Sequence, residues 1–214
     1  MPARGRTTSQ LSISLDGFIA GPDQSDDNPI GIGGMQLHEW ALATRSWRAQ
    51  HGLEGGDPGA DSEIIERLVT GIGAYVMGRK MFGGGDGAWD PDWNGWWGDD
   101  PPYHTPVFVL THHPREPLEL DGGTTFHYVT EGIEAALDQA HAAAAGLDVS
   151  IAGGAGAVQQ TLAAGQLDEL FLHIAPVLLG RGERLLENVG DARLEQVEVI
   201  GSGSVTHVRY RVIR

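Results

Sequence analysis

Three short segments place glycine, basic or hydroxyl side chains where an apolar run ends. The first, IAGGAGAV at residues 151–158, follows such a run and begins a helical pattern. The backbone N–H groups that could contact a ligand there belong to Gly153, Gly154, Ala155, Gly156 and Val158. Free N–H groups in the first turn of a helix attract anions. The spacing does not satisfy G-x-G-x-x-G, which disfavours a standard dinucleotide-binding fold. A tight turn packed by small residues is an equally good interpretation of the glycines alone.

Basic and hydroxyl side chains follow two further apolar runs. They are Gly78, Arg79 and Lys80 after residues 75–77, and Thr111 and His112 after residues 107–110. An arginine can bind a phosphate through two parallel hydrogen bonds, although a solvated basic pair would give the same sequence. Because the carboxyl ends of parallel strands meet at one edge of a sheet, the three segments together predict a site for a polyanionic nucleotide.

The hydrophobic pattern predicts a sheet with interleaved helices. Short apolar runs predict strands at residues 11–15, 74–77, 107–111, 125–129, 149–152 and 170–174. Apolar residues at helical spacing predict helices at residues 61–70, 131–145 and 156–164. Apolar and polar residues alternate over residues 194–213 on both sides of a Gly-Ser-Gly-Ser turn, which indicates a β-hairpin. The expected fold class is α/β, with a mainly parallel central sheet and an antiparallel C-terminal hairpin.

The composition excludes several classes of protein. Among 214 residues, 14 Lys and Arg stand against 29 Asp and Glu, and the net charge of −15 disfavours nucleic acid and anionic membranes as partners. No apolar run approaches the ~20 residues of a membrane helix and no export signal is visible, so a cytoplasmic protein is expected. Cysteine is absent, which removes disulfides and cysteine nucleophiles. The histidines lack H-x-x-x-H spacing, so no metal site is expected.

Several ordered motifs resemble the dihydrofolate reductase-like superfamily, and most closely its branch with the RibD C-terminal domain of riboflavin biosynthesis. They are SLDGFIA at 14–20, VMGR at 76–79, VLT at 109–111, IAGG at 151–154 and APVLLGRG at 175–182. The resemblance implies one domain with a three-layer α/β/α fold over residues 9–214, after a flexible N-terminus at 1–8. It also implies an NADPH-dependent reductase that transfers hydride to a small pterin- or pyrimidine-like heterocycle, similar to dihydrofolate reductase and 5-amino-6-(5-phosphoribosylamino)uracil reductase.

The resemblance assigns the three segments to the cofactor NADPH. Arg79, flanked by Gly78 and Lys80, would meet its 2′-phosphate or pyrophosphate, and residues 153–158 would meet the pyrophosphate. Thr111 and His112 would lie on the adenine ribose side. This assignment agrees with the anion site expected from the residues themselves.

On the substrate side, the resemblance singles out the SLDGFIA motif. Ser14 and Asp16 match positions near the nicotinamide and the substrate. Phe18 and Ile19 begin a stretch, residues 18–21, that matches a mobile loop closing over both. A plain β-turn at Asp16 and Gly17 is the alternative interpretation.

The proton that accompanies hydride transfer needs a donor, and Asp16 is the first candidate. Asp61 and Glu63 fall where dihydrofolate reductases carry a carboxylate on their first long helix, and either would serve if it were buried with a raised pKa. Both also suit an ordinary acidic first turn of a helix. The riboflavin enzymes carry a lysine for a phosphorylated substrate where this chain has Gln10.

Residues 83–102 form an insertion rich in glycine, tryptophan and aspartate. It contains four of the six tryptophans, including Trp96 and Trp97. Such aromatic residues rarely stay exposed, so they are expected to wall a substrate pocket, to cover an interface of a homodimer, or to fold under the domain.

A second function remains open beside the reductase. A non-catalytic, dimeric nucleotide- or small-ligand-binding protein on the same fold would also explain the missing lysine and the ambiguous carboxylates. Oxidation of NADPH with a pterin or pyrimidine distinguishes the two.

Overall fold

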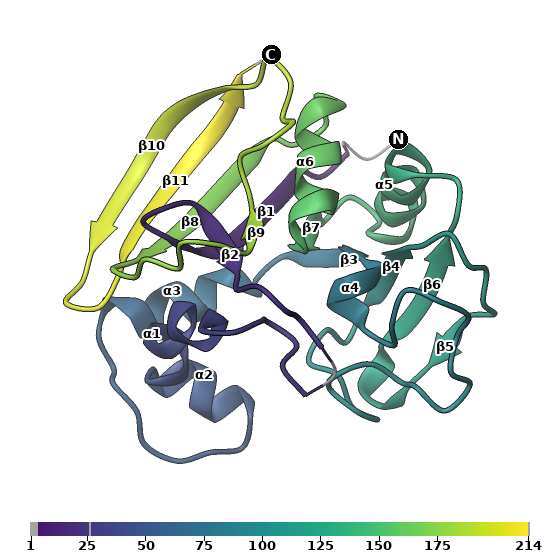
Figure 1. The fold of residues 1–214 in the computed structure, drawn as a ribbon, viewed down its shortest axis with the longest axis horizontal. Coiled ribbons are helices and arrows are strands. Elements are labelled where there is room, and N and C mark those ends of the chain that lie inside the picture. Colours follow the sequence, from purple (N-terminus) through teal and green to yellow (C-terminus); the bar gives the residue numbers. More distant parts are fainter. Residues whose placement is uncertain (1–3, 26, 214) are drawn as a thin grey trace.

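The computed structural model describes residues 4–25 and 27–213, and its centre is a nine-stranded sheet (Figure 1). The strand order is β10-β11-β8-β1-β7-β3-β4-β6-β5. The inner strands are parallel: β8 (Glu169–Ala175), β1 (Thr7–Ser14), β7 (Asp148–Gly153), β3 (Ile72–Gly78), β4 (Pro106–Leu110) and β6 (Thr125–Val129). The edges are antiparallel: β11 (Thr206–Ile213) and β10 (Arg193–Gly201) on one side, and β5 (Leu118–Glu119) on the other.

Helices α5 (Ile133–Ala143) and α6 (Ala155–Ala163) cover one face of the sheet. Strand β3 shows how the two faces arise, because Val76 packs with the side chains of these helices while Tyr75 and Met77 face the opposite side. All three residues are buried. A strand covered on both faces explains its continuous apolar sequence.

The opposite face is covered in two parts. Over β8 and β11 lie η1 (Gly34–Leu37), α1 (Glu39–Leu42), α2 (Arg45–Gln50) and α3 (Ala60–Leu68). Over β3, β4 and β6 lies the insertion, whose Trp89 and Trp93 pack with Phe82 of α4 (Arg79–Phe82). The result is the expected three-layer α/β/α fold, with one outer layer completed by a loop.

Strand β1 pairs unequally with its two neighbours. Its pairing with β8 extends from Thr8 to Ser14, whereas its pairing with β7 ends at Ser9. The sheet therefore opens between β1 and β7 toward the carboxyl ends of these strands.

The predicted strands and helices are confirmed, with shifts at their ends. The helix expected from residue 131 begins at Ile133, because Gly132 has a φ of 93° that no helix accommodates. Strand β1 begins at Thr7, and Arg6 before it forms an ion pair with Asp148 at 2.7 Å. The sheet therefore includes residues assigned to a flexible terminus from the sequence, of which residues 1–3 lie outside the described part.

Candidate active site

The ends of β3 and β7 meet at the carboxyl edge of the sheet. Gly78 ends β3, and a Cβ atom placed on it would lie 3.6 Å from the backbone nitrogen of Gly154, just after β7. The two turns therefore present bare backbone at the same place, as the glycine segments predict.

The first turn of α6 begins beside them without a side-chain cap. Its N-cap residue is Gly154, and no described atom lies within 4 Å of the position that a Cβ would take there. Gly156 is exposed, while Ala155 and Val158 are buried against the core. The start of this turn therefore faces open space at Gly154, where the helix dipole favours an anion, although the N–H groups of Ala157 and Val158 already donate to the carbonyl of Gly154.

Arg79 lies at this edge, but its hydrogen bonds go to its own chain. Its Nη2 donates to the carbonyl oxygens of Gly84 at 3.1 Å and Gly87 at 3.2 Å, and its Nη1 donates to Thr111 Oγ1 at 3.3 Å. The Nε atom is buried and has no partner among the described residues. Arg79 can therefore form the two predicted hydrogen bonds with a phosphate only if its bonds to Gly84 and Gly87 are displaced.

The remaining predicted cofactor residues lie around Arg79 with different partners. Thr111 is buried, and its hydroxyl also accepts a hydrogen bond from the backbone nitrogen of His113 at 3.1 Å. His112 is exposed beside it. Lys80 forms an exposed ion pair with Glu183 at 3.3 Å. The structure thus brings the three segments to one edge and leaves Lys80 and His112 at the surface.

Asp16 fixes a loop and is a poor proton donor. Its carboxylate accepts hydrogen bonds from Ser14 Oγ at 2.6 Å and from the backbone nitrogens of Leu179 at 3.1 Å and Gly180 at 2.6 Å. The bond from Ser14 is the main reason that the pKa of Asp16 falls to about 2. The carboxyl group is ionised at neutral pH, which argues against the predicted role of Asp16 as the proton donor.

The residues expected in a mobile loop form a second, two-stranded sheet. Strand β2 (Phe18–Ala20) pairs antiparallel with β9 (Glu183–Arg184). Phe18 is buried under the guanidinium of Arg184, whose carbon lies 4.4 Å from the ring centre, and Ile19 packs in the main core. These contacts hold residues 18–20 against the main core in this structure, and closure of the stretch over a ligand stays a prediction.

Neither helix carboxylate is a fully buried acid. Glu63 is exposed. Burial acts to raise the pKa of Asp61, but hydrogen bonds from Ser204 at 2.7 Å, His207 at 3.1 Å and Ser202 at 3.0 Å outweigh it, and the pKa is lowered. Asp61 is therefore a carboxylate held by hydrogen-bond donors.

Two buried histidines next to Asp61 were not found from the sequence. His207 of β11 lies opposite His173 of β8, and their Nδ1 atoms are 2.8 Å apart. Trp40 packs on both rings. The only signal in the sequence was the presence of histidine in two apolar strands, because the pairing depends on a strand register that the sequence does not reveal.

The insertion folds partly under the domain, which was one of the three alternatives. Trp89 donates a hydrogen bond to the carbonyl of His113 at 2.8 Å, and Trp93 donates to that of Phe82 at 3.1 Å. Trp96 meets the edge of Trp93 at 4.7 Å, and Trp97 is 46% exposed and reaches His51 of the α2 end at 5.4 Å. On the sheet face opposite α5 and α6, the insertion thus connects the part over β3, β4 and β6 with the part covered by α2.

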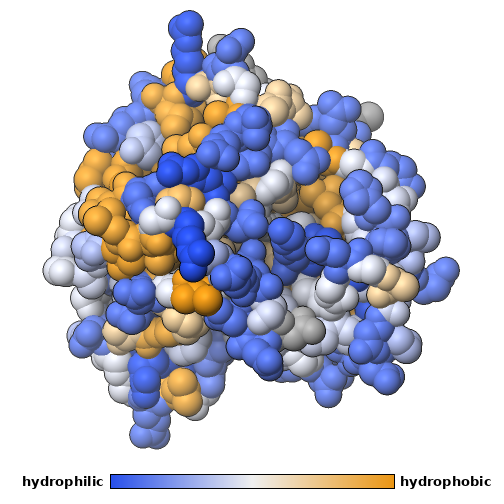
Figure 2. Space-filling view, in the orientation of Figure 1, coloured by the Kyte–Doolittle hydropathy of each residue, from blue (hydrophilic) through white to orange (hydrophobic). Residues whose placement is uncertain are grey.

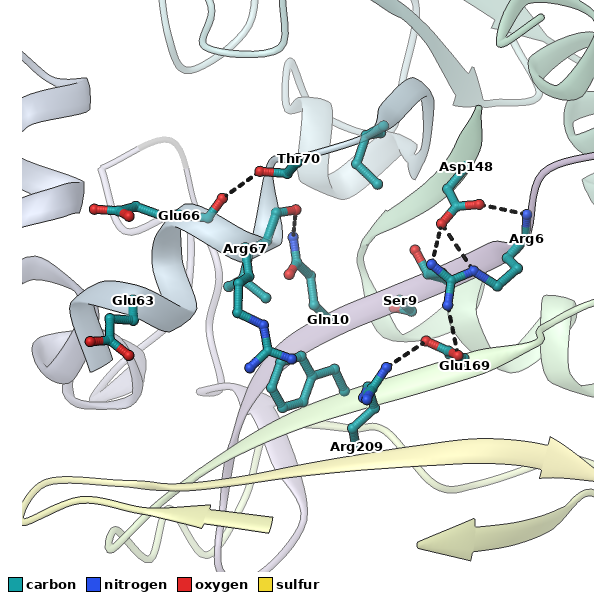
Figure 3. A pocket seen from close by; sticks show the side chains of 14 residues that line it. Arg6, Ser9, Gln10, Glu63, Glu66, Arg67, Thr70, Asp148, Glu169 and Arg209 are labelled. Atoms are coloured by element: carbon teal, nitrogen blue, oxygen red, sulfur yellow. Dashed lines mark hydrogen bonds and ion pairs between the residues drawn. The ribbon is translucent and has the colours of Figure 1, made fainter. Parts of the chain in front are cut away.

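A groove lies toward the amino edge of the sheet (Figure 3). It has a volume of about 560 Å³. Gln10, Phe171 and Arg209 form part of its floor, and α3 lines one wall. Gln10 Nε2 donates to the carbonyl of Leu68 at 3.0 Å, and Arg209 forms an ion pair with Glu198 at 3.2 Å. The groove is highly charged, but its arginines already have carboxylate partners.

Two further classes of site were searched for in the described residues. No group of three or more His, Cys, Asp or Glu side chains there has an arrangement that would hold a metal ion. Within the same residues, no helix has the length and apolar character needed to cross a membrane.

The fold places the chain in the dihydrofolate reductase-like class. A sequence profile of the RibD C-terminal domain matches residues 7–208, and the chain belongs to this family. No curated protein sequence gives a significant match.

Solved structures share this fold over almost the whole chain. A riboflavin biosynthesis protein from Shewanella sp. PV-4 is 20% identical, with a TM-score of 0.65 and coverage of 98% of this chain and 99% of that one. Dihydrofolate reductase from Enterococcus faecalis, solved with NADP(H), is 14% identical, with a TM-score of 0.56 and coverage of 99% of each chain. A Thermotoga maritima deaminase and 5-amino-6-(5-phosphoribosylamino)uracil reductase is 14% identical, with a TM-score of 0.57; the match covers 98% of this chain but 57% of that longer one.

Proposed function

We propose that the chain is an NADPH-dependent reductase of riboflavin biosynthesis that transfers hydride to a C=N or C=O bond of a small pterin- or pyrimidine-like heterocycle. Membership of the RibD C-terminal domain family and the activities named for its structural neighbours support the reaction class. The observation that carries the cofactor assignment is the meeting of the Gly78 and Gly154 backbones beside the uncapped start of α6.

The residues at this edge fit the phosphates of a dinucleotide. The buried Nε of Arg79 lacks a partner in the described structure, and the space over Gly154 is open. Two separate phosphate groups of one dinucleotide would give a partner to Arg79 and to the first turn of α6. We therefore assign the pyrophosphate to residues 154–158, and the 2′-phosphate to Arg79, with Lys80 and His112 beside it.

The chain itself contributes to the reaction by positioning the cofactor and the substrate and by excluding water. Bound dihydronicotinamide supplies the hydride. The sheet opens between β1 and β7 toward the carboxyl ends of these strands, and we place the nicotinamide and the substrate at this opening. Asp16 ties the end of β1 to residues 179–180 and so fixes one wall of this opening. Holding both reactants in a fixed geometry is the main way in which such a site accelerates hydride transfer.

Binding and turnover test this proposal separately. NADPH and NADH are titrated against the protein while tryptophan fluorescence is followed, because Trp89 packs on Arg79. NADPH oxidation is then measured with 5-amino-6-(5-phosphoribosylamino)uracil and with dihydrofolate. We expect tighter binding of NADPH than of NADH, and oxidation with one of the two substrates. Binding without oxidation would favour the non-catalytic ligand-binding alternative, and no binding would refute both.

We also propose a homodimer, located in the cytoplasm with its cofactor. Apolar surface gathers on the side of β10 and β11 (Figure 2), where Leu194, Val199 and Ile213 are 40%, 50% and 43% exposed. Strand β10 is also an edge of the sheet with one side unpaired. A second copy of the chain would cover these side chains and this edge.

A further inference from the structure

A short exposed segment of the insertion lies between two anchored aromatic residues. We call residues 84–88, with the sequence GGDGA, the strap. Before the strap, Phe82 at the end of α4 is 2% exposed, and after it, Trp89 packs edge to face on Phe82 at 5.6 Å. Residues 85–88 are exposed, and the only side chains of the strap are those of Asp86 and Ala88. The strap can therefore move without disturbing the packing on either side of it.

Arg79 provides the hydrogen bonds that hold the strap. Its Nη2 donates to the carbonyl oxygens of Gly84 and Gly87, and the described residues provide no other hydrogen bond to residues 84–88. Burial is the main cause that lowers the pKa of Arg79, and the negative charge of Asp86 is the strongest influence against it. The strap thus offers the guanidinium two oxygen acceptors and one negative charge, which are the partners that a bound phosphate offers.

The closed strap leaves the guanidinium of Arg79 incompletely paired. The Nε atom is buried without a hydrogen-bond partner in the described part of the protein, and the Trp89 ring covers one face of the group. Buried N–H groups are rarely left in this state. Nε and Nη2 present their N–H groups side by side, and two oxygens of a phosphate match this geometry. Because the carbonyls of Gly84 and Gly87 use the same Nη2, the strap and a phosphate are competing partners of Arg79.

A different arginine holds the rest of the insertion. Arg115 Nη1 donates to the carbonyl of Trp93 at 2.9 Å, and its Nη2 donates to that of Pro91 at 3.2 Å. Trp89, which follows the strap directly, donates to the carbonyl of His113 at 2.8 Å. Release of the strap therefore leaves the tryptophan-rich part of the insertion in place.

Three consecutive glycines connect α4 to the strap. Gly83, Gly84 and Gly85 have φ values of 86°, 79° and 72°. Glycine leaves such a conformation at little cost, whereas a residue with a side chain adopts it only with strain. A Cβ atom on Gly83 or Gly84 would overlap a tryptophan ring, but at Gly85 no described atom lies within 4 Å of that position. Gly85 is therefore the position at which the closed strap can be strained without a clash.

We propose that the strap closes the Arg79 site, and that a phosphate monoester of the cofactor opens it by taking the place of the two carbonyl oxygens. The proposal rests on the proposed NADPH-dependent function, in which Arg79 binds the 2′-phosphate. NADH has no 2′-phosphate, so it binds while the strap stays closed. The measured affinity for NADPH is the intrinsic affinity reduced by the fraction of molecules whose strap is open. A change that weakens only the closed strap should therefore strengthen the binding of NADPH and not that of NADH.

The first test is Gly85→Ala in the full chain. Alanine at this position strains the closed strap and contacts no other described atom. We expect the Kd for NADPH, measured by calorimetry, to fall about fivefold, while the Kd for NADH changes by less than about twofold. Adenosine 2′-monophosphate carries the phosphate without the nicotinamide and should also bind about fivefold more tightly. Unchanged or weaker binding of both phosphate-bearing ligands would overturn the proposal.

Two further glycine-to-alanine variants serve as controls. Gly87→Ala adds the same methyl group to the strap in open space, but Gly87 has no positive φ, so the closed strap is not strained. Gly55→Ala, in the loop after α2, also has open space, and its φ of 78° reproduces the strain outside the strap. We expect neither variant to bind NADPH more tightly than the wild type. Tighter binding by either one would contradict an effect of Gly85→Ala through the strap.

The second test follows the strap directly in the wild type. Nitrogen-15 NMR relaxation of the backbone amides of residues 84–88 reports their order on the picosecond to nanosecond timescale. A ligand that covers a loop increases the order of that loop, whereas release from Arg79 decreases it. We expect the order of the strap to fall when NADPH or adenosine 2′-monophosphate binds, and to stay unchanged with NADH. An increase in order with NADPH, or no change, would refute the release of the strap.

The outcomes separate the strap from the proposed function. If the wild type binds and oxidises NADPH, but Gly85→Ala does not bind it more tightly and the order of the strap does not fall, the strap proposal alone is refuted. If the wild type binds neither NADPH nor adenosine 2′-monophosphate, the cofactor assignment fails, and the strap proposal fails with it. If Gly85→Ala does not fold, the NMR measurement on the wild type decides the matter.

Discussion

The guanidinium carbon of Arg79 lies 3.1 Å from the centre of the Trp89 ring. With the bonds to the Gly84 and Gly87 carbonyls, this contact orders the start of the insertion around a single cation. The side chain proposed to bind the cofactor phosphate is thus also the anchor of the insertion. Cofactor binding and loop order are expected to depend on each other at this residue.

Substitution of Arg79 should weaken NADPH binding more than NADH binding. Arg79→Ala removes a charged donor whose loss is worth about 1.5–3 kcal/mol, so the Kd for NADPH should rise about tenfold or more. Arg79→Lys keeps the charge but not the planar group, and should fall between wild type and Arg79→Ala. Fluorescence titration or calorimetry measures both cofactors. Arg193→Ala, at the opposite edge on β10, is the control, and equal losses for NADPH and NADH would contradict the 2′-phosphate assignment.

Gly156→Ala should change stability and cofactor affinity in opposite directions. Gly156 lies in the first turn of α6 without a positive φ, and the nearest atom to its added Cβ is Gln160 Nε2 at 4.0 Å. Alanine is a better helix former than glycine by about 0.5–1 kcal/mol, so the melting temperature should rise slightly. The methyl group occupies space assigned to the pyrophosphate, so the Kd for NADPH should increase. A variant that is more stable and binds NADPH as tightly as the wild type would place the phosphates elsewhere.

The elements of the sheet and the glycine turns at its edge could be predicted from the sequence because they depend on local patterns. Apolar runs mark strands such as β3, and a glycine such as Gly78 marks a turn wherever it lies in the fold. Parallel strands have their carboxyl ends at one edge of the sheet, so the convergence of the three segments at that edge was predictable as well.

The chemistry of the carboxylates could not be predicted in this way, because their partners are distant in sequence. Asp16 is held by Leu179 and Gly180, and Asp61 by residues of the C-terminal hairpin turn. The pairing of His173 with His207 depends on the register of β8 and β11, and a shift of one residue would turn one ring to the other face. Tertiary contacts of this kind determine the hydrogen-bond partners of each carboxylate, and therefore whether it could donate a proton.

Val199→Lys should disrupt the proposed homodimer. Val199 is 50% exposed on the edge strand β10, and a charged side chain there opposes burial against a second copy. We expect the dimer dissociation constant to rise at least about tenfold, a loss of ~1.4 kcal/mol, as measured by gel filtration with light scattering at several concentrations. Leu53→Lys, at a loop residue that is 47% exposed, controls for loss of an apolar side chain. A wild-type protein that is monomeric at all concentrations would refute the interface.

Asp16→Asn should lower stability in a pH-dependent way without changing the pH profile of turnover. The pKa of Asp16 is lowered from 3.8 to about 2 in the folded protein, so its carboxylate stabilises the fold above pH 4. This contribution is lost as pH falls from about 4 toward 2, where the folded protein takes up the proton as well. The melting temperatures of wild type and variant should therefore differ most at neutral pH and converge at about pH 2. If Asp16 were the proton donor, the variant would instead lose an ionisation from the profile of kcat, which distinguishes a residue that fixes the loop from one that performs the chemistry.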